Sequence, residues 1–375
     1  MMRIFKAAQV FDGWTLHDHA AVSLHEDGRI AALHRTTDSL PNADNITELG
    51  AGILAPGFVD LQVNGGDGVM VGPDTDADQL ARICAAHARL GATAILPTLI
   101  TDTPETTRHV IAAAAAAHAR HVPGFAGLHL EGPHLDPLRK GAHDAALIRP
   151  MTSDDLTAIC EAAAALPSLI VTIAPEAVSC DQIRTMHAAG VIVSLGHSDC
   201  STDAAHAAHD AGARCVTHLY NAMSGLATRA PGLVGAALTT PLAAGIIADG
   251  IHVAPECIKI ALHMKAPDSL FLVSDAMAFA GTDKTEITLN GRRILRHGNR
   301  LTLADGTLAG ADISLPQSVA HLVGLGVDPA RALAMASRIP ADVIGAQDRG
   351  RFAPGARGDL VFLSDRFELR GVFAH

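Results

Sequence analysis

The stretch "GFVDLQVNG" (57–65) follows Pro56 and runs into a glycine-rich turn, "GGDG". Its apolar residues predict one buried strand that ends abruptly at a loop. Two amide side chains, Gln62 and Asn64, stand at the end of that strand. The pattern therefore predicts a core strand whose last residues present polar groups to a loop.

Apolar runs of this kind recur seven times downstream, and alanine-rich stretches with helical character lie between them. Near-continuously apolar strands that alternate with helices are typical of a parallel sheet covered by helices, and eight of them are typical of a (β/α)8 barrel. The predicted strands are 57–63, 92–99, 124–131, 168–175, 191–197, 213–219, 243–249 and 270–276. The predicted helices include 77–90, 104–119, 153–165, 201–211 and 254–264. We therefore predict an α/β fold with a TIM-like barrel.

Both ends of the chain have a different pattern. The first 56 residues contain short alternating runs joined by Asp-Gly turns, which predict antiparallel strands, and the tail "GARGDLVFLSDRFELRGVFAH" has the same character. We expect a small β-sandwich domain built from both termini. The predicted units are 1–56 and 345–375 for this domain and 57–344 for the barrel. An insertion at 285–305, with "LNGRR" as a hairpin turn, precedes the last helices.

The composition of the 375-residue chain narrows the functional classes. Hydrophobic residues make up 49% but aromatic residues only 3%, so Ala, Val, Ile and Leu must fill the core. A formal charge of −11 without any basic run argues against nucleic-acid and membrane partners. The start of the sequence has no signal-like apolar run, and the six cysteines have no C-x-x-C spacing. These two features predict a reduced, cytoplasmic protein.

Polar residues end several of the predicted strands, where such barrels carry their catalytic groups. Glu131 ends the third apolar run, and a buried carboxylate requires a nearby cation. His197 and His218 end the fifth and sixth runs, and Asp275 ends the eighth. Two imidazoles and one carboxylate, with water in the fourth position, form the ligand set of an open catalytic zinc site. The strand ends therefore predict a metal centre.

Each of these residues also has an ordinary structural interpretation. With 21 histidines in the chain, a single histidine at a strand end is more often structural than a ligand. Glu131 could cap a helix or pair with Arg139 or Lys140, and Asp275 could be a helix N-cap. A nucleophilic serine is the rival chemistry, but "GHSDC" around Ser198 lacks the last glycine of a G-x-S-x-G elbow. The coincidence of polar residues at matching strand ends favours the metal site.

At these positions the sequence resembles the amidohydrolase superfamily, and within it the N-acetylglucosamine-6-phosphate deacetylases. The matching segments are "PGFVDLQVNG" (56–65), "HLEGPHLDPLRKGAH" (129–143), "GHS" (196–198), "THLYNAM" (217–223), "RAPG" (229–232), "ADGIHV" (248–253), "VSDAM" (273–277) and "LAG" (308–310). They follow the order of the family motifs, and "HLEGP", "DGIHV" and "SDAM" are the specific ones. The chain departs from familiar members at His134, where a tryptophan is common, and we do not interpret His134 as a ligand.

The resemblance implies a role for each matching residue. The implied metal ligands are Glu131, His197 and His218. Asp275 would act as acid and base, and His143 would hydrogen-bond the substrate carbonyl oxygen. The implied substrate contacts are Ala142, His143, Asn221, Ala222, Arg229, the Asp249–His252 loop, Leu308, Ala309 and Gly310. Arg229 and His252 would supply positive charge for a phosphate. Without the "RAPG" motif, we would interpret Arg229 as one partner of a surface salt bridge.

The first strand of the superfamily normally ends in His-x-His, where this chain has Gln62 and Asn64. Amides are poor zinc ligands but good hydrogen-bond partners, so we expect them to orient a metal-bound water or a ligand instead of binding a second ion. The expected cofactor is one divalent transition metal per subunit. Zinc comes first, with iron, cobalt or manganese as alternatives.

The activity that the resemblance implies is metal-dependent hydrolysis of N-acetyl-D-glucosamine 6-phosphate to D-glucosamine 6-phosphate and acetate, in amino-sugar metabolism. It further implies a homodimer in which the partner chain completes part of the phosphate pocket. The expected partner molecule is a phosphorylated N-acetyl amino sugar, with no nucleic acid and no membrane. Two alternatives stay open: another amidohydrolase reaction, such as that of a deaminase or cyclic amidase, and a catalytically inactive barrel that acts as a binding protein.

Overall fold

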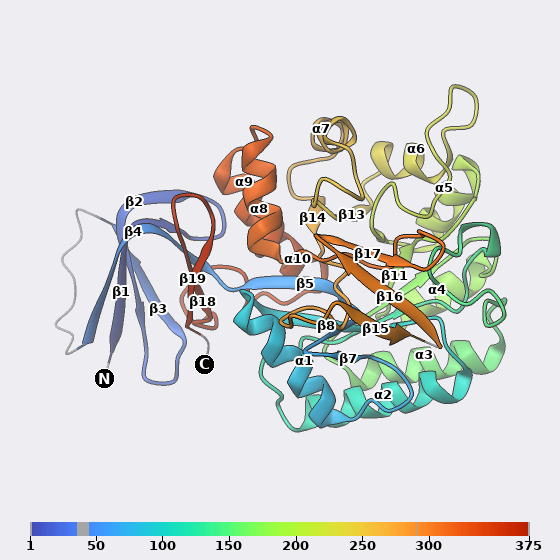
Figure 1. Cartoon of the computed structure of the whole chain (residues 1–375), viewed down its shortest axis with the longest axis horizontal. Coiled ribbons are helices and arrows are strands. Elements are labelled where there is room, and N and C mark those ends of the chain that lie inside the picture. The colour runs from blue at the N-terminus through green and yellow to red at the C-terminus, as the bar shows by residue number, and fades with distance from the viewer. Residues whose placement is uncertain (1, 36–44, 290, 374–375) are drawn as a thin grey trace.

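The computed structural model describes residues 2–35, 45–289 and 291–373. Its centre is a sheet of eight parallel strands, each paired with the next one along the chain (Figure 1). The strands are β5 (Phe58–Val63), β8 (Ala92–Ile100), β9 (Leu128–Glu131), β10 (Leu169–Ile173), β11 (Ile192–Leu195), β12 (Cys215–Val216), β13 (Ala243–Ile246) and β14 (Leu270–Leu272). The predicted (β/α)8 fold class is confirmed, although most strands are shorter than the apolar runs that predicted them.

The barrel closes between its first strand, β5, and its last, β14. A parallel bridge joins Val63 to Ala276, and the backbone N–H of Asn64 donates to the carbonyl of Ala276 at 2.8 Å. Deeper in the seam, the buried carboxylate of Asp60 accepts a hydrogen bond from the N–H of Ser274 at 3.2 Å. Strand β14 is only 3 residues long, so few backbone hydrogen bonds can join it to β5. The side chain of Asp60 adds a further link across this seam.

Helices cover the outside of the barrel (Figure 1). The five helices that the sequence predicts are present with bounds that agree to within one residue. They are α1 (Ala77–Arg89), α2 (Pro104–Ala119), α3 (Ser153–Ala165), α5 (Thr202–Ala211) and α7 (Pro255–Met264). The others are α4 (Cys180–Ala188), α6 (Gly232–Thr239), α8 (Leu315–Gly324), α9 (Pro329–Ala336) and α10 (Arg338–Val343). Both α9 and α10 pack on β5 and β14, so they cover the seam from outside.

Strands from both termini form a second sheet beside the barrel, as predicted (Figure 1). In spatial order they are β19 (Leu369–Phe373), β18 (Leu360–Leu363), β4 (Asn45–Pro56), β1 (Arg3–Phe11), β2 (Leu16–Leu24) and β3 (Ile30–His34). The pairs are antiparallel except for β1 with β4, which is parallel. The two termini are thus held in one sheet with its own apolar core.

Strand β4 leads directly into β5 through Gly57, which links the terminal sheet to the barrel. A Cβ atom at Gly57 would lie only 1.9 Å from Oγ1 of Thr93, at the start of β8. Glycine is therefore required at this joint, because the backbone passes directly against its neighbouring strand.

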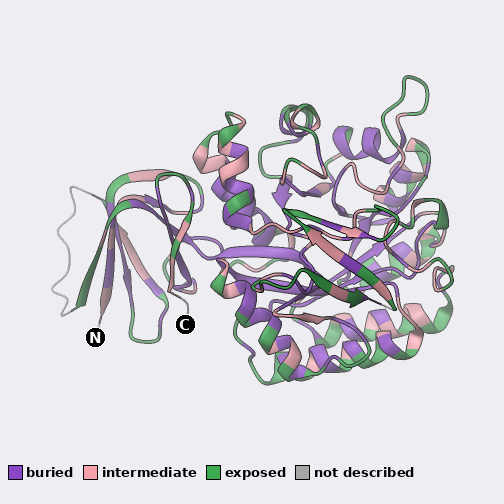
Figure 2. Ribbon diagram, in the orientation of Figure 1, coloured by how far each residue is buried: buried purple, intermediate pink, exposed green. Residues whose placement is uncertain are grey.

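The insertion forms a small antiparallel sheet of β15 (Glu286–Leu289), β16 (Arg292–His297) and β17 (Arg300–Leu303), which crosses one side of the barrel in Figure 1. The predicted "LNGRR" turn joins β15 to β16, although Asn290 lies outside the described residues. Figure 2 shows the barrel strands as almost continuously buried, with exposed residues on the outer helices and loops. Within the described part of the chain, no helix is both long and apolar enough to cross a bilayer.

Candidate active site

The three predicted metal ligands meet above the carboxyl ends of neighbouring strands. Glu131 is the last residue of β9, while His197 and His218 lie just beyond β11 and β12. Oε1 of Glu131 lies 3.2 Å from Nε2 of His197 and 3.0 Å from Nε2 of His218, and the two nitrogens are 3.0 Å apart. The side chains of all three residues are at most 5% exposed. Three potential ligand atoms therefore converge on one buried point.

The backbone is strained where these side chains turn inward. His197, His218 and Asp275 have φ angles of 46°, 32° and 49°, in the left-handed region that few non-glycine residues adopt. Strained positions of this kind cluster at functional sites, where the surrounding structure holds them. The turns also explain why the strands end earlier than the apolar runs of the sequence.

The hydrogen bonds of His197 determine which of its nitrogens can bind a metal. Its Nδ1 lies 2.8 Å from the backbone carbonyl of Arg139, which can only accept, so Nδ1 carries the proton. The Nε2 lone pair consequently faces Glu131 and His218. Nδ1 of His218 is buried and has no hydrogen-bond partner among the described residues.

This donor set fits a divalent transition metal. A tetrahedral ion with ligand bonds of about 2.0–2.2 Å separates its ligand atoms by roughly 3.3–3.6 Å, slightly more than the 3.0–3.2 Å observed. A carboxylate oxygen and two imidazole nitrogens also suit zinc and its neighbours in chemical type. Burial works to raise the pKa of Glu131, but the imidazoles of His197 and His218 beside it hold that pKa well below its ordinary value.

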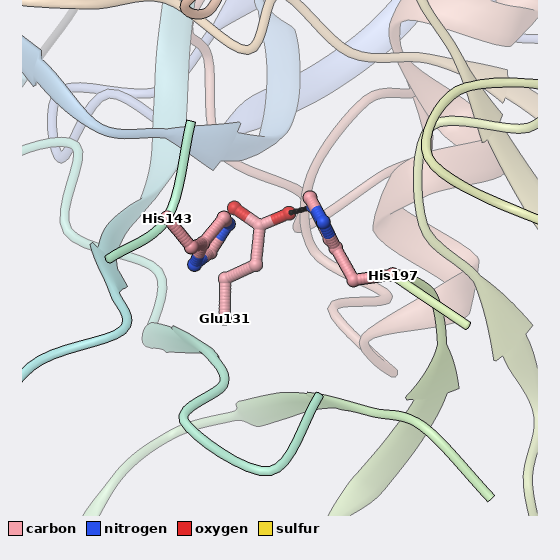
Figure 3. Close-up of side chains that lie close together, drawn as sticks. All are labelled: Glu131, His143 and His197. Atoms are coloured by element: carbon pink, nitrogen blue, oxygen red, sulfur yellow. Dashed lines mark hydrogen bonds and ion pairs between the residues drawn. The ribbon is translucent and has the colours of Figure 1, made fainter. Parts of the chain in front are cut away.

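His143 lies beside Glu131 (Figure 3), and its ring also contacts the ring of His197 edge-on, with 4.3 Å between the ring centroids. Ligand atoms of these three residues lie within 4.8 Å of one another, so His143 could be mistaken for a ligand in place of His218. However, Nδ1 of His143 accepts the backbone N–H of Thr101 at 3.2 Å, so its proton must be on Nε2. Burial, together with the charge of His197, lowers the pKa of His143 to about 3, and the ring is therefore neutral. A neutral ring in this tautomer offers an N–H donor, not a lone pair.

Asp275 lies on the seam side of the site and is bound by both amides of the first strand. The Asn64 amide donates to Asp275 Oδ1 at 2.7 Å, and the Gln62 amide donates to the same oxygen at 3.2 Å. Gln62 also donates to Oε1 of Glu131 at 3.1 Å. Both amides are buried, and Gln62 thus connects the Glu131 carboxylate to the Asp275 carboxylate.

The burial of Asp275 changes its acidity. Burial, followed by the nearby charge of Glu131, raises the pKa of Asp275 to about 6, whereas the hydrogen bond from Asn64 lowers it. A carboxyl group with this pKa can exchange a proton near neutral pH. The site therefore combines a candidate metal-ligand set with a carboxyl group that changes its charge close to physiological pH.

A cavity of about 250 Å³ opens onto these groups. It is lined by seven of the predicted substrate residues, namely Ala142, His143, Asn221, Ala222, His252, Leu308 and Gly310. The Asp249 carboxylate accepts a hydrogen bond from Nδ1 of His252 at 2.6 Å, and so directs the other ring nitrogen of His252 toward the cavity. Ala309 is fully buried between two lining residues. These positions are consistent with the substrate pocket that the sequence predicted.

Arg229 lies elsewhere. It is exposed on the loop between β12 and α6, which projects from the barrel beside α6 (Figure 1). The loop also carries Leu226, a large apolar side chain that is 60% exposed. The structure therefore does not bring Arg229 together with the other predicted substrate residues of its own chain.

Several lining residues are absent from the sequence prediction. Leu289 and Thr307 come from the insertion and its return, and Ile100 and Met277 complete the apolar wall. Thr101, which orients His143, is also absent from it. Its position directly after the second barrel strand is the signal that could have identified it, since polar residues at the other strand ends belong to the site.

His134 is buried, and its hydrogen-bond partners lie outside the group of converging ligand atoms. Its Nδ1 lies 3.2 Å from the carbonyl of Arg149, and its Nε2 lies 3.9 Å from the Asp155 carboxylate. Burial lowers the pKa of His134, so the ring is neutral. These partners place His134 among the loop and helix residues that follow β9, away from the ligand atoms.

Comparison with known proteins adds independent findings. The model of a family described as "Amidohydrolase family" matches residues 53–374. A curated N-acetylgalactosamine-6-phosphate deacetylase from Shewanella sp. is 37% identical over 99% of this chain and 94% of its own length. The crystal structure of N-acetylglucosamine-6-phosphate deacetylase from Pasteurella multocida has a TM-score of 0.95 at 31% identity, covering 100% of this chain and 98% of that one. A mutant N-acetyl-D-glucosamine-6-phosphate deacetylase from Mycobacterium smegmatis, solved in complex with N-acetyl-D-glucosamine-6-phosphate, has a TM-score of 0.92 at 30% identity, with the same coverage.

Proposed function

Because this chain belongs to the amidohydrolase family, we propose that it hydrolyses the acetamide of N-acetyl-D-glucosamine 6-phosphate to D-glucosamine 6-phosphate and acetate. The observation that carries the proposal is the convergence of Glu131, His197 and His218 beside Asp275 at the floor of a sugar-sized cavity. Two solved structures of the same fold, which are 31% and 30% identical to this chain, carry the name of that deacetylase. The reaction proposed for this chain would belong to amino-sugar breakdown or recycling.

One divalent transition metal per subunit would be held by Glu131, His197 and His218, with zinc the first choice and iron, cobalt or manganese as alternatives. When bound there, it would activate water and polarise the amide carbonyl. Gln62 and Asn64 stand where a second ion would need imidazoles, and both donate N–H groups to carboxylates. Donors at these positions support a mononuclear site.

Asp275 would transfer protons in both halves of the reaction. Its Oδ1 is engaged by the Gln62 and Asn64 amides, so Oδ2 is the oxygen left to accept a proton from the attacking water. The same oxygen would then return that proton to the departing amine. The two amides therefore hold the acid–base group in one orientation throughout.

His143 would stabilise the oxyanion. Its Nε2–H is fixed by the Thr101 backbone, which occupies Nδ1 and prevents the alternative tautomer. A preoriented N–H that needs no rearrangement during the reaction is an effective donor to a developing negative charge. Because the His143 ring is neutral, it adds no positive charge to that of the ion that His197 and His218 would bind.

We propose that the sugar phosphate is recognised by His252 from its own chain and by Arg229 of a second subunit. The exposed position of Arg229 beside the exposed apolar Leu226 supports a role across a subunit contact and fits a homodimer. An anionic ligand needs such local charge, because the chain as a whole carries a formal charge of −11. All six cysteines are free, which supports a reducing, cytoplasmic location.

A second substrate belongs in the same test. The Shewanella relative is named an N-acetylgalactosamine-6-phosphate deacetylase, and that sugar differs from the first only in the configuration of its 4-hydroxyl group. The acetamide and the phosphate, which the metal site and the basic groups would recognise, are common to both sugars. The reaction class is therefore the same for either substrate.

The test is acetate release by the purified protein from both sugar phosphates, with unphosphorylated N-acetylglucosamine as the control and metal content measured in parallel. We expect turnover of a phosphorylated sugar and close to one transition metal per chain. Absence of acetate release from both phosphates by metal-loaded protein would contradict the proposal. Full activity after complete metal removal would contradict the proposed centre.

A further inference from the structure

A layer of polar side chains lies inside the barrel directly beneath the proposed metal ligands. Its members are His129 on β9, Thr172 on β10, Ser194 on β11 and Thr217 just after β12, and we call them the hydroxyl–imidazole layer. All four are at most 5% exposed. Barrels of this kind usually fill their interior with branched apolar residues, and a polar group in that position costs free energy unless it is fully hydrogen-bonded.

The four side chains form one continuous chain of hydrogen bonds. His129 Nδ1 lies 3.0 Å from the carbonyl of Leu61, and His129 Nε2 lies 2.7 Å from the Thr172 hydroxyl. Thr172 and Thr217 are 2.6 Å apart between their hydroxyl oxygens, and Ser194 and Thr217 are also 2.6 Å apart. The chain therefore crosses the interior of the barrel from β11 to β5.

The direction of every donor in this chain is determined. The Leu61 carbonyl can only accept, so Nδ1 of His129 donates and Nε2 must accept from Thr172. Because each hydroxyl has one proton, Thr217 must then donate to Thr172, and Ser194 must donate to Thr217. A chain with a single allowed direction is an ordered network and cannot relax into alternative patterns without losing a bond.

The layer contacts the strands that carry the metal ligands. His129 lies two residues before Glu131 and on the same face of β9, and Thr172 is the register partner of Glu131 on β10. Thr217 directly precedes His218 in the sequence. His129 and Thr217 are thus linked to a ligand through one or two residues of backbone, and Thr172 is linked to Glu131 through the pairing of β9 with β10.

Gly196 connects the layer to the third ligand. A Cβ atom at this position would lie 2.9 Å from Cγ2 of Thr172 and 3.1 Å from Cβ of Thr217. The two threonines therefore pack against the residue that precedes His197, at the point where the backbone turns into its left-handed conformation. Movement of either threonine would be passed directly to the His197 ring.

We propose that the hydroxyl–imidazole layer positions Glu131, His197 and His218, and so sets the metal affinity of the site. This inference rests on the proposed metal centre. The layer residues do not touch the ion or the substrate; they act through the backbone of the ligand-bearing strands. Outer partners that orient metal ligands typically change metal affinity or activity about 10–100-fold when they are removed.

The decisive variants are Thr172→Val, which replaces the central hydroxyl by a methyl group of similar size, and Thr172→Ser, which restores the hydroxyl. Zinc affinity is measured by competition between the full-length holoprotein and a chromophoric chelator, and the thermal midpoint is recorded for each variant. Thr93→Val is the matched control, since Thr93 is a buried threonine at the opposite end of a barrel strand.

We expect Thr172→Val to weaken zinc binding about 10–100-fold, Thr172→Ser to restore it, and Thr93→Val to change only the thermal midpoint. Wild-type zinc affinity in Thr172→Val would overturn the inference and make the layer purely structural. If Thr172→Val does not fold, Ser194→Ala, at the donor end of the chain, decides in the same way with a smaller expected loss. Failure of the wild-type protein itself to bind zinc, iron, cobalt or manganese would instead refute the proposed metal centre.

Discussion

The two sides of the barrel mouth use similar strand ends for opposite purposes. On the side of β9, β11 and β12, Glu131, His197 and His218 present acceptor atoms to one point. On the seam side, Gln62 and Asn64 present N–H donors, which bind the oxygens of Glu131 and Asp275. One side therefore presents ligand atoms to a cation, whereas the amide N–H groups of the other side bind carboxylates.

The difference explains why the absence of His-x-His need not mean loss of activity. An imidazole pair on β5 would offer lone pairs for a second ion, whereas the amides donate hydrogen bonds to Asp275, the proposed acid–base group, beside the proposed metal ligands. Electrostatics strengthens the contrast, because burial raises the pKa of Asp275 to about 6 while the histidines keep that of Glu131 well below its usual range. Two carboxylates close together can thus take different roles.

The largest loss of activity is expected when one imidazole of the proposed metal-ligand set is removed. His197→Ala should lower kcat/KM by roughly 10³-fold or more, because the metal contributes several kcal/mol to the barrier reduction. Metal content by elemental analysis should fall well below that of the wild type. His134→Gln is the control: it changes a buried histidine near β9 that lies away from the ligands, so metal content should be retained. Loss of metal in His134→Gln but not in His197→Ala would invert the assignment.

On the seam side, Asp275→Asn should remove turnover while leaving metal and substrate binding largely intact. The amide cannot accept the proton of the attacking water, and loss of one acid–base group typically costs on the order of 10²–10⁴ in rate. Single-turnover kinetics combined with substrate binding by calorimetry would measure both quantities. A kcat close to that of the wild type would show that Asp275 is not the proton acceptor.

A weaker effect is expected from the exposed arginine outside the barrel mouth. Arg229→Ala should raise KM for the phosphorylated sugar about 10–100-fold, since a charge-assisted hydrogen bond contributes roughly 1.5–3 kcal/mol. The KM for unphosphorylated N-acetylglucosamine should change little. Arg108→Ala, at an exposed arginine on α2, serves as the control. An equal loss on both sugars would show that Arg229 has a structural role.

The smallest expected effect is a shift in the pH dependence of activity, and it tests the role of the Asn64 amide. For the wild type, kcat/KM should fall as the pH drops through about 6, because protonated Asp275 cannot act as a base. The Asn64 N–H stabilises the ionised form, so Asn64→Ala should raise the pKa of Asp275 and move this acidic limb up by about one pH unit. Metal content should not change. An unshifted pH profile would show that the Asn64 hydrogen bond does not tune the base.

Much of the fold could be predicted because its signals are local. Apolar runs such as "GFVDLQV" (57–63) and alanine-rich stretches such as 104–119 have compositions and lengths that favour strand or helix directly, and the helix bounds agree with prediction. The parallel pairing of β1 with β4 was not predicted, because alternating runs and Asp-Gly turns describe neighbouring strands and contain no information on distant pairing.

The candidate site divides in the same way. Glu131, His197, His218 and Asp275 were recognisable because each stands at the end of an apolar run, and the barrel topology brings such ends together. The hydroxyl–imidazole layer was not recognisable. A threonine within a strand has the same local pattern whether its hydroxyl is idle or holds a histidine from 43 residues away, as Thr172 holds His129.

The sequence by itself determined which chemical groups are available: a carboxylate and imidazoles at strand ends, amides on the first strand, and an alanine-rich chain that forms a barrel. Only the tertiary structure decided what each group can do. His143 and His197 are both strand-end or loop histidines, yet the Thr101 N–H makes His143 a donor, whereas the Arg139 carbonyl leaves His197 a lone pair. The physical reason is that the tautomer of an imidazole is set by the partner of its second nitrogen, and in this barrel those partners come from other strands and loops.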